Sequence, residues 1–126
     1  MQVKFYKCMH CGNIAVKVVD SGVPLDCCGE QMVELIPDTQ DAALEKHVPV
    51  VTVDGSHIHV NIGSVDHPME EKHFIEFICL MKNGGYEIHP LAPGDAPSTD
   101  FYLGDNEKAV CVYEYCNIRG LWKTDI

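Results

Sequence analysis

Apolar and polar residues alternate along the segment 57–62. On a β-strand, one face of this segment carries only isoleucine and valine, and the other carries His57, His59 and Asn61. The turn sequence Asp54-Gly55-Ser56 separates it from the β-branched run 48–53, which predicts a hairpin. We expect the apolar face of this hairpin to be buried and the face with the two histidines to be solvated.

Further short apolar segments follow, separated by glycine, proline and asparagine. The pattern predicts strands at 74–81, 86–91, 101–103 and 109–116, with turns at 83–85 and 104–107 and a loop at 90–99. Residues 42–45 allow one helical turn. We expect His89 to be exposed, because it alternates with Tyr86 and Ile88. We expect Cys79 and Cys111 to be buried, inert thiols. The fold class is therefore mainly β, with a sandwich of short strands in the second part of the chain.

Four cysteines stand in two local pairs near the start of the chain. Cys8 and Cys11 form a Cys-x-x-Cys turn, the segment 14–19 reads as a strand, and Cys27 and Cys28 follow directly after one another. Two such pairs can present four thiolates to one tetrahedral iron or zinc ion. His10 is expected to face solvent, because four sulfurs already complete such a site.

The chain divides at a short polar segment. We predict a small four-cysteine domain at 1–36, a linker at 37–42 and a β-sandwich domain at 43–126. A unit as small as the first needs a staple such as a metal ion, because its core is too small to hold it folded.

Composition narrows the choice of partners and compartment. Nineteen acidic and nine basic side chains give a formal charge of −10, which argues against nucleic acid or an anionic membrane as a partner. The N-terminal residues lack the apolar run of a signal peptide, so we expect a cytoplasmic protein. Seven cysteines, an odd number, then favour metal ligands and core thiols over disulfides.

Histidines bracket a second candidate site. His67 and His73 stand near the two ends of the loop 63–73, His47 precedes a predicted strand, and Cys116 ends another. Their convergence at one end of the sandwich is a hypothesis, because spacing alone cannot place strand ends together.

These motifs resemble a known family. The segment 4–34 resembles desulforedoxin, a small iron protein with a Cys-x-x-Cys and an adjacent Cys-Cys pair. The segments 45–49, 67–69, 73–76 and 115–123 resemble the iron domain of superoxide reductase. In this order they make the chain similar to the desulfoferrodoxin family, the two-iron form, from about residue 4 to residue 123.

The resemblance implies two irons and an immunoglobulin-like sandwich in a homodimer. One iron would be held as a tetrathiolate by Cys8, Cys11, Cys27 and Cys28. The family binds the second with four histidines in a plane and one axial cysteine, with the sixth position open. His47, His67, His73 and Cys116 match four of these ligands, and the fourth histidine falls at Arg119, whose guanidinium has no lone pair to donate.

The resemblance also implies reduction of superoxide to hydrogen peroxide, with electrons from an external reduced carrier such as a rubredoxin-like protein. Lys46, beside His47, is the candidate for steering the anionic substrate, and Glu45 matches the family's other residue near the open position. Because of Arg119, two alternatives stay open. One is a non-enzymatic electron-transfer or redox-responsive protein that uses only the tetrathiolate iron, and the other is a structural protein with zinc at both sites.

Overall fold

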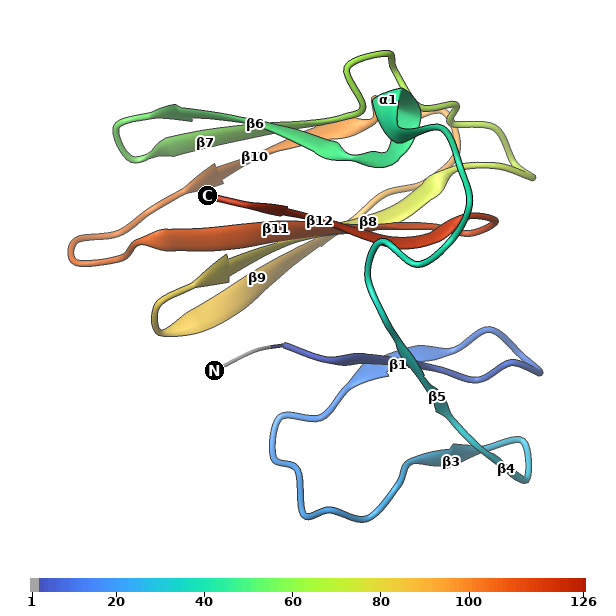
Figure 1. The fold of residues 1–126 in the computed structure, drawn as a ribbon. Helices are drawn as coiled ribbons and strands as arrows, with labels where there is room; N and C mark the ends of the chain where they lie inside the picture. The colour runs from blue at the N-terminus through green and yellow to red at the C-terminus, as the bar shows by residue number, and fades with distance from the viewer. Residues whose placement is uncertain (1–2) are drawn as a thin grey trace. The chain divides into compact units, whose positions relative to one another are not determined.

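The computed structural model describes residues 3–126, which form two compact units that meet in sequence between Ile36 and Pro37 (Figure 1). Both units are built almost entirely from antiparallel strands, and the one α-helix of the described residues is a single turn. The predicted mainly β fold is therefore confirmed.

The first unit contains a three-stranded sheet and a two-stranded ribbon. The sheet has the order β2 (Ile14–Val16), β1 (Phe5–Lys7) and β5 (Val33–Leu35), and the ribbon pairs β3 (Asp26–Cys27) with β4 (Glu30–Gln31). The strand predicted at 14–19 is shorter than expected. Val16 pairs with Phe5, where β1 begins, so Val18 and Val19 have no neighbouring strand, and both are 83% exposed.

The second unit is a sandwich of two antiparallel sheets. One sheet has the order β10 (Ser98–Tyr102), β7 (His57–Ile62) and β6 (Pro49–Asp54). The other has the order β12 (Gly120–Asp125), β11 (Ala109–Cys116), β8 (Ile75–Lys82) and β9 (Gly85–Pro90). Sheets of three and four strands are the counts of an immunoglobulin-type sandwich. The helix α1 (Leu44–His47) leads into β6 at one end of it (Figure 1).

The apolar core lies between the two sheets. Ile58, Val60 and Ile62 are fully buried and pack with residues of β8, β10 and β11, including Leu80, Phe101 and Val112. The hairpin of β6 and β7 around Gly55 and the buried apolar face of β7 confirm the alternation in the sequence. The polar face of β7 is partly exposed, and His57 and His59 both hydrogen bond to Asp100 Oδ1 at 2.8 Å.

Two expectations for the sandwich need correction, and one strand was missed. His89 is only partly exposed, because it stacks on Phe101 at 4.2 Å and bonds to Thr99 Oγ1, whereas Ile88 on the opposite face is 39% exposed. Strand β10 begins at Ser98, within the segment predicted as a loop. The strand β12, which was not predicted, pairs with β11 along its whole length.

Two further features bear on the sites. Cys79 and Cys111 are buried as expected, and burial raises the pKa of Cys79 to about 12. The segment that follows Pro37 hydrogen bonds to β12, with Asp38 N–H donating to Leu121 O and Lys123 N–H donating to Asp38 Oδ1.

No helix in the described part of the chain is long and apolar enough to cross a membrane.

Candidate metal centres

The first cluster gathers the four N-terminal cysteines. Their sulfur atoms all lie within 4.8 Å of one another. A tight turn presents the first pair, because Gly12 N–H donates to Cys8 O at 2.9 Å and Cys11 N–H donates to Cys8 Sγ at 3.4 Å. At the second pair, Cys28 has a φ of 54°, in the left-handed region that side chains other than glycine seldom adopt. This unusual backbone lets two adjacent residues point their sulfurs to one place.

The electrostatics of this four-cysteine cluster favour a bound cation. The N–H of Cys11 holds the pKa of Cys8 down at about 6, while the neighbouring thiols raise the pKa of Cys28 to about 12. Four thiolates therefore do not form together without a positive ion among them, and a tetrahedral metal ion meets that need. His10 is exposed beside the cluster, as expected.

The second cluster, the His/Cys cluster, lies at one end of the sandwich. His47 ends α1, His67 and His73 lie in the connection between β7 and β8, and Cys116 ends β11. One ligand atom from each lies within 4.8 Å of the others, so the structure brings together four residues that the sequence spreads over 70 positions. His47 and His67 are 3% and 2% exposed, and Cys116 is fully buried.

Two imidazoles of this cluster are oriented by bonds to backbone carbonyls. His47 Nδ1 lies 2.8 Å from Ala43 O, and His67 Nδ1 lies 2.6 Å from Pro68 O. A carbonyl accepts only from a protonated nitrogen, so Nε2 of each ring keeps its lone pair. Nε2 of His47, His67 and His73 are buried and have no hydrogen-bond partner. Buried nitrogen lone pairs that meet beside a thiol are the expected donor set of a transition metal.

Proton affinities at the second cluster agree with ligation. Burial lowers the pKa of His67 to about 4, and burial together with the charges of His47 and Arg119 lowers the pKa of His73. Burial raises the pKa of Cys116, and the N–H groups of Ile118 and Arg119 oppose that shift by donating to its sulfur. The cluster therefore offers a hydrogen-bonded sulfur and, at His67 and His73, imidazoles whose neutral form is favoured.

A hollow of about 500 Å³ opens onto this cluster. Lys46, His47, His73 and Arg119 line it together with residues of the segment 41–43. Lys46 and Arg119 therefore both line the hollow beside candidate ligands, and, in addition to burial, the charges of both lower the pKa of His73. Glu45 is exposed on α1 and does not line the hollow.

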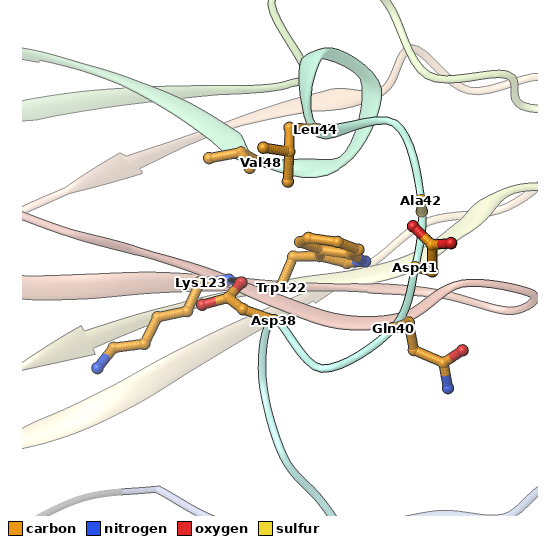
Figure 2. A pocket seen from close by; sticks show the side chains of 8 residues that line it. All are labelled: Asp38, Gln40, Asp41, Ala42, Leu44, Val48, Trp122 and Lys123. Carbon is orange, nitrogen blue, oxygen red and sulfur yellow. Dashed lines mark hydrogen bonds between the residues drawn. The ribbon is translucent and has the colours of Figure 1, made fainter.

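Trp122 supports the same end of the sandwich from β12. Its ring lies 5.4 Å from that of His47, and its Nε1–H donates to Arg119 O at 3.0 Å. Figure 2 shows the indole beneath Leu44 and Val48, in a neighbouring hollow of about 450 Å³. The indole thus connects α1, which carries His47, with the turn that carries Arg119.

The sequence reasoning missed two residues near the second cluster. Asn117 Oδ1 accepts from Phe74 N–H at 2.9 Å and its Nδ2 donates to Lys72 O at 3.1 Å, which ties the loop of His73 to the end of β11. Glu114 stands between Val112 and Cys116 on β11. Its side chain is fully buried, and neither carboxylate oxygen has a hydrogen-bond partner. Burial and the charge of Asp38 raise its pKa well above the usual range. The sequence did contain a sign that Glu114 is unusual, because it is an acidic residue within an otherwise apolar strand.

Comparison with known proteins assigns both units of the chain to one family. The profile of desulfoferrodoxin matches residues 39–125, and the profile of the desulfoferrodoxin N-terminal domain matches residues 1–35. Desulfoferrodoxin from Nitratidesulfovibrio vulgaris is 45% identical over 124 residues, covering 98% of this chain and 97% of that protein. Desulfoferrodoxin from Syntrophotalea carbinolica is 47% identical over 125 residues, with 98% and 97% covered.

Solved structures agree in fold. The superoxide reductase from Treponema pallidum superimposes with a TM-score of 0.84 at 31% identity, covering 99% of this chain and all of that one. The 1Fe superoxide reductase from Giardia intestinalis covers 65% of this chain and 97% of its own, with a TM-score of 0.56 and 31% identity. The four-cysteine cluster and the His/Cys cluster fit the two iron centres of the family. This chain therefore belongs to the desulfoferrodoxin family.

Proposed function

We propose that this chain is a superoxide reductase. One electron and two protons convert superoxide to hydrogen peroxide, and no dioxygen is formed. The observation that carries the proposal is the set of three unpartnered Nε2 atoms gathered with Cys116 Sγ beside a hollow that opens to solvent. Support from outside the chain comes from the Treponema pallidum superoxide reductase, which matches the fold over nearly the whole chain.

The proposed ligands of the second iron are His47, His67, His73 and Cys116. Iron bound there supplies the one-electron couple that the reaction requires, which zinc cannot supply. Burial lowers the pKa of His67 and so favours its neutral form, and the bonds from Nδ1 of His47 and of His67 to backbone carbonyls leave Nε2 of each ring available for the metal. Arg119 N–H donates to Cys116 Sγ at 3.4 Å, which stabilises the thiolate form of that sulfur.

Lys46 and Glu45 are the proposed residues near the substrate. Lys46 lines the hollow, so its positive charge attracts an anion to the cluster in a protein whose formal charge is −10. Glu45 is the adjacent exposed carboxylate on α1, at the position that the family resemblance marks, and we propose that it acts at the rim of the site.

The four-cysteine cluster is proposed to hold the other iron and to serve electron transfer. The donor is proposed to be an external reduced carrier of the rubredoxin-like class. We further propose a homodimer, as the family resemblance implies, and a cytoplasmic location.

Stoichiometry tests the proposal directly. Anaerobically purified protein should contain close to two irons per chain and should form one hydrogen peroxide per superoxide while the reductant is oxidised. A dismutase would form half as much peroxide and release dioxygen, and an electron carrier would consume no superoxide above background. Either of those two results would overturn the proposal.

Two matched variants separate the centres. Cys116→Ser should abolish superoxide reduction and leave the absorption of the ferric tetrathiolate intact, because Cys116 is remote in sequence from the four-cysteine cluster. Cys11→Ser should remove that absorption and keep the second iron. If Cys116→Ser retained full activity, the His/Cys cluster would not be the catalytic centre.

A further inference from the structure

Among the residues that the structure describes, Arg119 and Lys46 have no carboxylate partner. Lys17, Lys82 and Lys123 each pair with a neighbouring Asp or Glu. Within residues 3–126, neither the guanidinium of Arg119 nor the ammonium of Lys46 takes part in an ion pair, although acidic side chains outnumber basic ones by nineteen to nine. Lys4, Lys72 and Lys108 also take part in no ion pair within the described residues, so the feature that sets Arg119 and Lys46 apart is that they line the same hollow.

The two cations come from different elements and line one hollow. Lys46 belongs to α1 and Arg119 to the turn between β11 and β12, yet both line the hollow of about 500 Å³ above the His/Cys cluster. Both charges also act on His73, which lines the same hollow. The hollow is therefore a site of concentrated positive charge, with Asp41 as the one acidic residue that lines it.

Arg119 is anchored at its backbone, which prepares its side chain for binding. Its N–H donates to Cys116 Sγ and its carbonyl accepts from Trp122 Nε1 at 3.0 Å, so both sides of the residue are held. A guanidinium offers parallel N–H donors that match two oxygens of one anion, whereas an ammonium acts as a compact point charge. The pair therefore favours an anion with at least two oxygens over a chloride ion.

We propose that Arg119 and Lys46 form a binding site for a small oxyanion, of the phosphate, carbonate or carboxylate class, at the mouth of the His/Cys cluster. The bound oxyanion occupies the hollow through which superoxide reaches the cluster, so it slows superoxide reduction by competition. The competitive effect rests on the proposed function, but binding itself does not. The site is a property of this chain, because it depends on the arginine at position 119.

Calorimetry with inorganic phosphate tests the binding. Reduced, anaerobically prepared full-length protein is titrated with phosphate at constant ionic strength, with chloride as the reference. We expect millimolar binding at one site per chain, weakened about tenfold or more in Arg119→Gln, as for loss of a charged hydrogen-bonding partner. Lys46→Gln should weaken binding as well, and Asp41→Asn should strengthen it. Lys108→Gln, which removes an exposed lysine outside the hollow, should leave it unchanged.

Arg119→Lys keeps the positive charge at position 119 but removes the parallel N–H donors of the guanidinium. It should bind phosphate clearly more weakly than the wild type, because an ammonium cannot contact two oxygens in parallel. Unchanged binding in Arg119→Gln, or no phosphate binding in the wild type, would overturn the proposal, and wild-type affinity in Arg119→Lys would overturn the two-oxygen recognition. Superoxide consumption is measured separately. Phosphate binding without superoxide consumption would contradict the proposed function alone, and superoxide consumption unaffected by bound phosphate would refute the competition.

Discussion

Gly63→Ala should damage the His/Cys cluster from a position that carries no ligand. Gly63 has a φ of 84°, and a Cβ there would lie 2.6 Å from Glu45 O and 2.8 Å from Lys46 Cα and would also overlap Val65 O. All three are backbone atoms of the segments that carry His47 and His67. Because Val65 N–H donates to Glu45 O at 2.9 Å, these segments are bonded to each other and cannot separate freely.

The size of the effect follows from two contributions. A left-handed backbone costs a residue with a side chain about 1–2 kcal/mol, and forced overpacking adds about 1–3 kcal/mol, so unfolding of the sandwich should become easier by about 2–5 kcal/mol. Gly55→Ala is the matched control. Its φ is 60°, but a Cβ there would meet no atom within 4 Å, so only the first contribution applies.

Urea unfolding and iron analysis measure both consequences. Gly63→Ala should lower the urea midpoint more than Gly55→Ala and should lose iron from the second centre, because the rings of His47 and His67 lie only 4.8 Å apart and a small displacement misplaces a ligand. The absorption of the four-cysteine centre serves as an internal standard. If both variants had the same midpoint and the same iron content, the close contacts around Gly63 would not constrain the site.

Three further substitutions test the site and its surroundings. Arg119→His adds an imidazole at the missing position and should raise the affinity of the second centre for iron by about tenfold or more, measured by competition with a chelator; unchanged affinity would show that the new imidazole does not reach the metal. Asn117→Ala removes two bonds to the loop of His73 and should cost about 1–3 kcal/mol in urea unfolding while weakening iron binding; unchanged unfolding and iron binding would show that these bonds do not position the loop. Asp100→Asn tests pH dependence, because bonds from His59 and His57 hold the pKa of Asp100 below its usual value of 3.8. The unfolded chain then binds the proton more tightly, so the advantage of the wild type in urea midpoint should be full above about pH 4 and shrink as the pH falls below it; an advantage that grew in acid would refute this reasoning.

The hairpin around Gly55 could be predicted because its information is local. Strict alternation over 57–62 and a turn sequence that accepts a positive φ determine the strand, its buried face and its partner together. His89 could not be placed in this way. Strand β9 is at the edge of its sheet, where alternation separates Tyr86 and Ile88 from Glu87 and His89 and so predicts the wrong inner face. The contacts with Phe101 and Thr99, which come from a strand of the other sheet, decide it.

The four-cysteine cluster was also a local prediction, since two pairs of cysteines are close in sequence and a turn presents each one. The His/Cys cluster was not. Its members come from α1, from the connection between β7 and β8 and from the end of β11, so only the packing of the two sheets brings them together. Family resemblance supplied those residues, but it could not supply the carbonyl partners of His47 and His67 or the role of Asn117, which depend on backbone positions.

The substitution at position 119 changes where positive charge lies at the second centre. A histidine there would give up a lone pair to the metal and leave the hollow with Lys46 as its cation. An arginine keeps its charge at the rim, since its guanidinium stays protonated, and its backbone still bonds to Cys116 and Trp122. The turn between β11 and β12 is thus preserved by backbone bonds that do not depend on the side chain, and the side chain is free to serve anion binding. Loss of one ligand and gain of one anion-binding group are therefore separable effects. Arg119→Gln should remove the anion-binding group without restoring the ligand, and Arg119→His should restore the ligand while removing the guanidinium, so the two variants together measure each effect by itself.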